Sequence, residues 1–474
     1  MNGLFVVNTF AAVALYVLVT LVIPVFQDEE TQSGEASAWR LVGAILTWVG
    51  LALILLTAIA AIWPGVIAWC FRLNPKSADL TADLVRVMSP ALALQGITAV
   101  LTALLQVRGR FARPAAIGVA FNAGILIGIA VLHNRLGIRA AAWGVVLGAV
   151  LQIALQLPQF IRFWRTGGGR LAVTHPRLVG TGVLALPVLA GSVSQQINSL
   201  TDKIFASTVG NGKNAALNFA NALGSAPRTA LLFPLLIPLF PHIARLMNEG
   251  RHLEMTAAFG RAAGLLAMVA MPLSAFMAIE AHGLTQVAFE RKKCQHQCRI
   301  DIASAVHWYG LAIWAAFMVY LLNRALSAAR APKDIMVATL TTVVVVIGLD
   351  LALLEPMGIA GLALATLIGS IANAGIMLWQ LRRRLPGFEA RAVLVQQGRI
   401  AIATLPAAGV LIALSDVVSS VGHHWTGGAL ILAGKGLLAG VVFLAATRVI
   451  APAELRSSTD ALRSVVRRRR PAEG

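Results

Sequence analysis

Apolar runs of about 20 residues, separated by short polar and basic segments, follow one another along the whole chain. A helix of about that length spans the hydrocarbon core of a bilayer. We therefore predict about thirteen transmembrane helices, with ends set only to within several residues. The predicted spans are 3–26, 41–63, 87–107, 115–132, 140–159, 180–208, 215–242, 262–283, 303–327, 334–354, 358–381, 400–419 and 427–450.

Composition makes the bilayer the expected surroundings of these helices. Hydrophobic residues make up 58% of the 474 positions and charged residues only 12%, which is more apolar surface than a soluble fold can bury. The net charge of +19 does not indicate nucleic acid, because Lys and Arg stand in short clusters between the apolar runs. We predict an all-α polytopic membrane protein that contacts membrane lipids and binds no nucleic acid.

The distribution of positive charge predicts the orientation of the helices. Loops after odd-numbered spans hold about 26 Lys and Arg, against about 10 in the other loops, and the richer side of a membrane protein is cytoplasmic. The C-terminal tail is therefore expected inside and the N-terminus outside. Span 3–26 has no basic segment before it and no Ala-x-Ala cleavage site, so we interpret it as a membrane helix rather than a signal peptide.

Two stretches of the sequence resemble each other at a nearly constant offset. Leu104–Pro114 resembles Leu321–Pro332, and three later pairs of identical residues each lie 221 positions apart. These pairs are Gly137 with Gly358, Gly148 with Gly369, and Gln159 with Gln380. An even number of spans separates the copies, so both cross the membrane in the same direction.

The repeat predicts two parallel helical lobes, with a substrate cavity between them and alternating access by rocking of the lobes. We expect an N-terminal lobe over 1–162, an inter-lobe linker over 163–178 and a C-terminal lobe over 179–384. A C-terminal transmembrane helix pair follows over 385–450, and a basic cytoplasmic tail over 451–474.

Several motifs occur in the order found in a known transporter family. They are Leu104–Pro114 with Asn122, Gln156–Gln159, Leu186–Gln195, Asp202–Ser207, Leu217–Leu223 with Pro227, and Arg324–Pro332. With these motifs the chain resembles the MurJ/MviN lipid II flippase family, within the multidrug/oligosaccharidyl-lipid/polysaccharide exporter superfamily.

The resemblance implies fourteen helices, arranged as two six-helix lobes and a C-terminal pair that can form a groove for lipid. The first helix of that plan and the basic segment after it have no counterpart here. An outside N-terminus is what the loss of one helix would produce. We expect that translation starts upstream of Met1 or that the gene is truncated.

The substrate that the resemblance implies, lipid II, carries a pyrophosphate, a peptide-bearing disaccharide and a polyprenyl tail. Cationic side chains in a wet cavity would hold the pyrophosphate, and ionisable groups within spans are the candidates. These are Asp202, Lys203 and Arg228, and Pro227 is expected to kink or interrupt the helix and help Arg228 turn inward. The alternatives are that Asp202 and Lys203 reach water at a helix end, and that Arg228 is an interfacial anchor.

Asn221 and Ala222 stand where family members usually have an acidic–basic pair. Asn221 is therefore a fourth candidate for substrate binding. Arg228 could replace the missing cation only if Pro227 breaks the helix, and we expect Arg228 to matter more than Lys203. Because span 3–26 also lacks Lys and Arg, a different substrate and a degenerate paralogue stay open.

Cys294 and Cys298 flank His296 in a loop expected outside. An ordinary loop, a periplasmic disulfide and a zinc site are the alternatives. Zinc would need four ligands, and only His282 or His307 is near in sequence. Together with the absence of nucleotide-binding and catalytic motifs from the loops, this predicts no metal and no cofactor.

We predict a flippase that moves lipid II across the bacterial inner membrane without covalent chemistry, with cell-wall synthesis proteins as candidate partners. An exporter of another polyprenyl-linked saccharide is the alternative in the same class. A non-transporting scaffold descended from a flippase is an alternative from another class. A membrane glycosyltransferase would need a cluster of loop carboxylates, for which Asp28, Glu29 and Glu30 are a poor basis.

Overall fold

The computed structural model describes most of the chain, and its regular secondary structure in that part is helical. The described residues are 22, 25–26, 28–64, 75–108, 110, 112–166, 172–178, 180, 201–202, 204–206, 208, 213–236, 243, 245–247, 249–289, 296–329, 331–385, 387–415 and 425–456. Contacts between residues divide the chain into two compact units, Met1–Gln196 and Ile197–Gly474.

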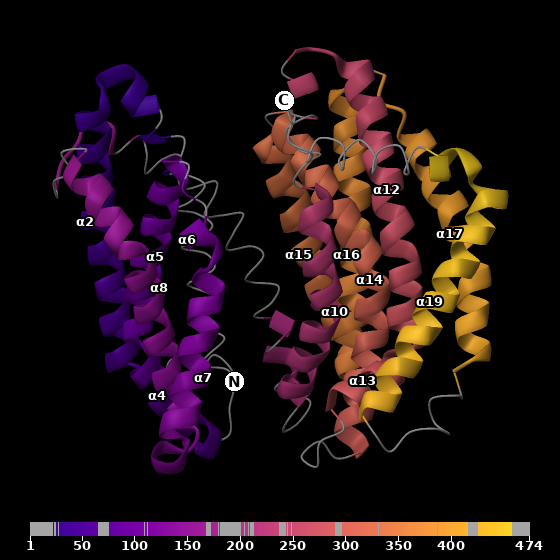
Figure 1. Ribbon diagram of the computed structural model, residues 1–474, viewed down its shortest axis with the longest axis horizontal. Helices are drawn as coiled ribbons and strands as arrows, with labels where there is room; N and C mark the ends of the chain where they lie inside the picture. The colour runs from indigo at the N-terminus through magenta and orange to yellow at the C-terminus, as the bar shows by residue number, and fades with distance from the viewer. Residues whose placement is uncertain are drawn as a thin grey trace, which may run out of the picture. The chain divides into compact units, whose positions relative to one another are not determined.

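The described part of the first unit is a bundle of helices, most of them long (Figure 1). Its helices are α2 (Glu35–Ile62), α4 (Pro75–Met88), α5 (Pro90–Val107), α6 (Ala112–Ala115), α7 (Ile117–Leu136) and α8 (Arg139–Thr166). The backbones of α7 and α8 touch, because a Cβ on Gly124 would lie 2.3 Å from the Cα of Gly148. Small residues that let two helices approach this closely are typical of membrane proteins.

The second unit holds the other helices of the described part of the chain. They are α10 (Lys213–Leu236), α12 (His252–Ile279), α13 (Ala281–Phe289), α14 (His296–Ala328), α15 (Pro332–Met357), α16 (Ile359–Arg384), α17 (Ala390–Ala413) and α19 (Trp425–Ile450). One buried core joins α10, α12, α14 and α16. A second core, with Ala267, Ile400 and Phe443, packs α17 and α19 against α12 at one edge of this unit (Figure 1).

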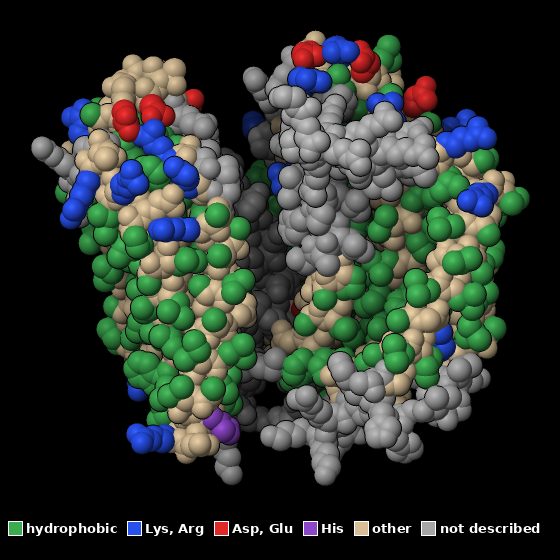
Figure 2. All heavy atoms as spheres, viewed as in Figure 1, with side chains coloured by type: hydrophobic (Ala, Val, Ile, Leu, Met, Phe, Trp, Pro, Cys, Tyr) green, Lys and Arg blue, Asp and Glu red, His purple; other side chains and the backbone are tan. Residues whose placement is uncertain are grey.

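The structure confirms the prediction of a polytopic all-α membrane protein. Within the described residues, 10 helices are long and apolar enough to cross a membrane, and each overlaps one of the predicted spans. Two of them, α12 and α17, begin ten residues before the predicted start. Of the other predicted spans, 215–242 overlaps α10, whereas 3–26 and 180–208 fall mostly outside the described residues. Side chains on the flanks of each unit are mostly hydrophobic, as lipid contact requires (Figure 2).

Charged side chains gather at the ends of the helices. Figure 2 shows many Lys and Arg side chains at one end of each unit. In the second unit, Arg251 forms an ion pair with Glu254 at 2.6 Å, and Arg399 forms one with Glu454 at 3.4 Å. These pairs lie in loops predicted to be cytoplasmic, as expected where arginines mark the inner membrane surface.

Candidate functional site

The four predicted site residues lie on two segments of the second unit. Asp202 is half-buried in the segment before α10, and Asn221 is exposed on α10. Arg228 is also part of α10, although its side chain is not among the described ones, and Lys203 lies outside the described residues. No described contact joins Asp202 to Asn221.

Pro227 does not interrupt α10, so that part of the prediction is wrong. The helix runs unbroken through 24 residues, from Lys213 to Leu236. Pro227 removes one backbone donor, but the surrounding turns keep their helical conformation. On a continuous helix, Arg228 follows Asn221 by seven residues and therefore lies on nearly the same face. Arg228 therefore does not take the place of the basic residue missing at Ala222, and it stays a candidate through the helix face that it shares with Asn221.

Asp350 of α15 is the acidic neighbour of Asp202, and the sequence analysis missed it. The Asp350 side chain is fully buried within the predicted span 334–354, close enough to Asp202 for the two carboxyl groups to interact. Neither carboxyl oxygen of Asp350 meets a hydrogen-bond donor among the described residues. An aspartate well inside an otherwise apolar stretch, Thr342–Leu354, was the signal that could have identified it.

This acidic pair can hold a positive charge. Two carboxylates side by side, one fully buried and the other half-buried, cannot both stay ionised at low dielectric without compensation. A proton or one small monovalent cation would supply that compensation. Within the described part of the chain, no group of three or more His, Cys, Asp or Glu could hold a metal ion, so a multidentate site of that kind is not seen there.

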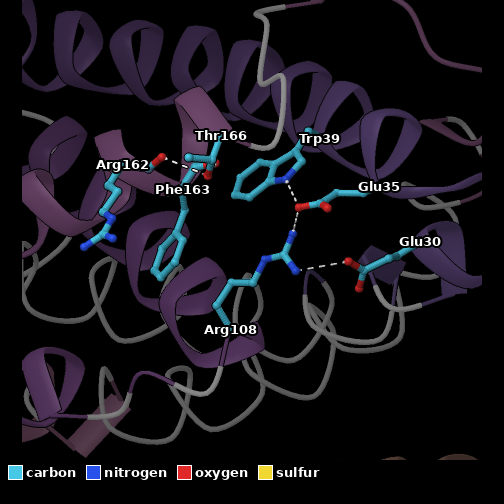
Figure 3. A network of polar contacts seen from close by, with 7 residues as sticks. All are labelled: Glu30, Glu35, Trp39, Arg108, Arg162, Phe163 and Thr166. Atoms are coloured by element: carbon cyan, nitrogen blue, oxygen red, sulfur yellow. Dashed lines mark hydrogen bonds and ion pairs between the residues drawn. The ribbon is translucent and has the colours of Figure 1, made fainter.

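At the predicted cytoplasmic end of the first unit, Arg108 is engaged by protein groups (Figure 3). It donates to Glu30 at 3.1 Å and also to Glu35, which in turn accepts a hydrogen bond from Trp39 Nε1 at 3.2 Å. The guanidinium also lies 5.6 Å from the centre of the Trp39 ring. With two carboxylates and an aromatic ring as partners, Arg108 is a structural cation rather than a ready phosphate ligand.

Part of the segment predicted to link the two lobes, residues 172–178, is attached to this same end of the first unit. Arg177 lies 3.0 Å from Glu29, and Glu29 accepts a hydrogen bond from Ser37 at 2.7 Å. His175 Nε2 lies 3.3 Å from Ser37 Oγ and 3.8 Å from Glu29. The hydrogen bond from Ser37 lowers the pKa of Glu29, against the opposing effect of burial. Burial lowers the pKa of His175, against the attraction of Glu29.

A second pair that the sequence analysis missed fastens the last helix to the second unit. Lys435 of α19 donates to Glu280 at 2.9 Å, and both side chains are nearly fully buried. Glu280 is the single residue between the long helix α12, which ends at Ile279, and the short helix α13, which begins at Ala281. A lysine inside the predicted span 427–450 was the available signal.

Cys298 is disulfide-bonded. Its partner lies outside the described residues, as do both other cysteines, Cys70 and Cys294. Of the three interpretations of the Cys294–Cys298 motif, the structure supports a disulfide at Cys298. An oxidised cysteine agrees with the predicted periplasmic position of this loop.

Comparison with known proteins identifies relatives along most of the chain. The model of one protein family, described as lipid II flippase MurJ, matches residues 9–431. A probable lipid II flippase MurJ from Synechocystis sp. is 23% identical over 333 residues, which cover 67% of this chain and 62% of that protein. A probable lipid II flippase MurJ from Rhizobium tropici is 23% identical over 469 residues, covering 95% and 86%.

Solved structures share the fold. A structure of lipid II flippase MurJ in an inward closed conformation superposes with a TM-score of 0.76 at 16% identity, covering 93% of this chain and 89% of that one. An inward-facing multidrug resistance MATE family transporter of the MOP superfamily gives a TM-score of 0.69 at 13% identity, covering 83% and 90%. At these identities the superpositions establish a common fold.

Proposed function

This chain belongs to the lipid II flippase MurJ family, and from that membership we propose that it carries lipid II across the bacterial inner membrane as a transporter, without covalent chemistry. The family match over residues 9–431 is the observation that carries the proposal. Rocking of two lobes around a substrate between them would give alternating access. Proteins of cell-wall synthesis, which would use the transported lipid II, are the candidate protein partners.

Polar groups inside the membrane support transport over a scaffold role. Asn221 presents an exposed amide on α10 that has no hydrogen-bond partner among the described residues. Arg228 lies seven residues further along the same helix face. A helix that contacted only lipid or protein would gain nothing from an unpaired amide in the bilayer. Arg228, Lys203, Asp202 and Asn221 stay the proposed substrate-binding residues.

The acidic pair supports coupling of transport to an ion. Asp350 is fully buried and without a donor among the described residues, and its neighbour is Asp202 of the proposed site. Uptake of a proton or a monovalent cation would remove the repulsion between these two carboxylates. If the proton or cation binds one conformation of the protein more tightly than the other, its uptake shifts the equilibrium toward that conformation. Coupling of transport to an ion requires such a difference in affinity.

Complementation of a conditional lipid II flippase mutant tests the proposal. The full chain is expected to restore growth when the resident flippase is depleted, and a variant with Arg228→Ala is expected to fail at equal membrane abundance. Absence of growth with normal amounts of the full chain in the membrane would contradict the proposal.

One observation favours a second candidate, an exporter of another polyprenyl-linked saccharide. Asn221 and Ala222 replace the acidic–basic pair that the family resemblance led us to expect, so the groups at this position carry no charge. A saccharide with a different headgroup would then be the cargo. Growth rescue by the full chain, with lipid II as the only essential cargo in the test strain, separates the two candidates.

A further inference from the structure

The polar residues of α10 lie at helical spacing. Asn214, Asn218, Asn221 and Ser225 are separated by four, three and four positions, which is the spacing of one face of an α-helix. Because α10 is unbroken over this stretch, the spacing holds in three dimensions. We call these four residues the amide face of α10.

The amide face flanks the side of α10 that packs on its own unit. Leu217, Ala220 and Gly224 are buried, and a Cβ on Gly224 would lie 3.0 Å from Tyr309 Cβ of α14. Asn221 is exposed, so the face turns from the packed side toward the open side of this helix. A purely structural polar stripe would instead be buried against a neighbouring helix.

The amide face is uncharged and keeps hydrogen-bonding capacity. Asn218 Nδ2 donates to the Asn214 carbonyl at 2.7 Å, and Ser225 Oγ donates to the Ala222 carbonyl at 3.2 Å. These two bonds stay within α10, and Asn214 and Ser225 also make other interactions. The amide of Asn221 has no partner among the described residues, so both its donors and its acceptor are available there.

The nearest cation before this face is already neutralised. Lys213, the first residue of α10, donates to Asp301 Oδ2 of α14 at 2.6 Å. Amides offer donors and acceptors without charge, which matches hydroxyl and acetamido groups of sugars and peptide amides. Pyrophosphate is better bound by charge-assisted donors such as arginine. The chemistry of the face therefore fits a neutral saccharide group.

We propose that the amide face of α10 binds the saccharide portion of the transported lipid, with Asn221 as its principal contact. This inference rests on the proposed function and assigns the sugar and the pyrophosphate of the lipid to different residues. Asn221 and its neighbours on the face select the sugar, whereas the pyrophosphate is held elsewhere, with Arg228 at the far end of the same face as the candidate.

A binding experiment with two ligands tests this division. The purified full chain in lipid nanodiscs is titrated with lipid II and, separately, with the same polyprenyl pyrophosphate lacking sugar and peptide. Asn221→Leu is expected to weaken lipid II binding roughly 3- to 10-fold, the effect of losing one or two hydrogen bonds, and to leave binding of the sugar-free lipid unchanged. Asn221→Gln, which keeps an amide, is expected to bind lipid II more tightly than Asn221→Leu and more weakly than the parent.

A matched control moves the amide without changing the composition of the helix. The double variant Asn221→Ala/Ala222→Asn shifts the group by about 100° around α10, and it is expected to bind lipid II as weakly as Asn221→Leu. Ala226→Leu, on another exposed side of the same helix, is expected to bind both ligands like the parent. Equal thermal unfolding midpoints establish that the variants are folded.

The outcomes separate this inference from the proposed function. If the parent binds neither lipid, the proposed function fails and the inference fails with it. If the parent binds lipid II but Asn221→Leu binds it equally well, only the inference is overturned. An equal loss for both lipids, or full affinity in the shifted-amide variant, also overturns it.

Discussion

Gly137 and Gly358, 221 residues apart, end equivalent helices in the same backbone conformation. Gly137 has φ 53° and ψ −126°, and Gly358 has φ 57° and ψ −134°. The N–H of Gly137 donates to the backbone carbonyl of His133 at 3.0 Å, and that of Gly358 donates to the backbone carbonyl of Leu354 at 2.9 Å. A new helix starts within two residues after each glycine. The repeat in the sequence is therefore a repeat of local structure, one copy in each unit.

Gly137→Ala and Gly358→Ala should each destabilise the protein, because a side chain is strained at this positive φ. The expected cost is about 1–3 kcal/mol per substitution. Gly348→Ala is the matched control, since this glycine lies within helix α15 and an added Cβ would meet nothing within 4 Å. Thermal unfolding in lipid nanodiscs measures the effect. Gly358→Ala unfolding at the same temperature as Gly348→Ala would contradict the assignment of strain.

Lys435→Ala should destabilise the second unit strongly, because it leaves the buried carboxylate of Glu280 without its partner. The expected cost is about 3–5 kcal/mol, as for other broken buried pairs. Lys435→Met/Glu280→Gln removes both charges and should be less destabilised than Lys435→Ala. Denaturation midpoints and the protease sensitivity of α19 give the readout. A double variant less stable than the single one would refute the pairing.

Acidification should loosen the linker from the first unit. The pKa values of both His175 and Glu29 are lowered, so the unfolded segment binds more protons than the docked one at acid pH. The contact of residues 172–178 with the rest of the first unit, here called docking, is then at full strength above the ordinary His pKa of about 6.5. It weakens as pH falls below that value, and the contribution of Glu29 is lost as pH falls through its own lowered pKa. Arg40 and Arg177 also disfavour a charged His175.

Hydrogen exchange of residues 172–178 at several pH values measures this loosening. Trp48 Nε1 donates to the Val173 carbonyl at 2.9 Å, so the exchange protection of this segment reports on docking. His175→Gln should remove the loss of protection that begins below the ordinary His pKa. The further loss at lower pH, which is due to Glu29, should remain. Protection in the parent that rises as pH falls would have the wrong sign for this account.

Asp350→Asn should preserve or raise stability while removing the response of transport to ions. The substitution replaces a buried acid that has no donor among the described residues by a neutral group of similar shape. Asp301→Asn is the control, because it breaks the ion pair with Lys213 and should lower stability. Transport rates at two pH values, with and without Na⁺, complete the test. A variant that keeps the parent's response to both ions would exclude the acidic pair from coupling.

Most of the architecture could be predicted from the sequence, because the bilayer imposes helix length and apolar composition directly. The spans around α12 and α14 and the repeat at Gly137 and Gly358 follow from local patterns of that kind. The positive charge of the loops likewise follows from membrane insertion.

Pairs that depend on tertiary contact could not be predicted in the same way. Glu280 and Lys435 are 155 residues apart, and Asp350 meets Asp202 only when α15 packs beside the segment before α10. The effect of Pro227 was also misjudged, because the packing of α10 on α14 sustains a helix that the proline alone would weaken. Local propensity yields to tertiary contacts at such positions.

Translocation of lipid II by the purified full chain in proteoliposomes tests the central claim most directly. Labelled lipid II is placed on one leaflet, and its appearance on the other is followed by an impermeant reagent. The account predicts transfer by the parent, none by Arg228→Ala, and partial transfer by Arg228→Lys, which keeps the charge without the planar fork. No transfer by the folded parent, or transfer by Arg228→Ala at the rate of the parent, would contradict the account.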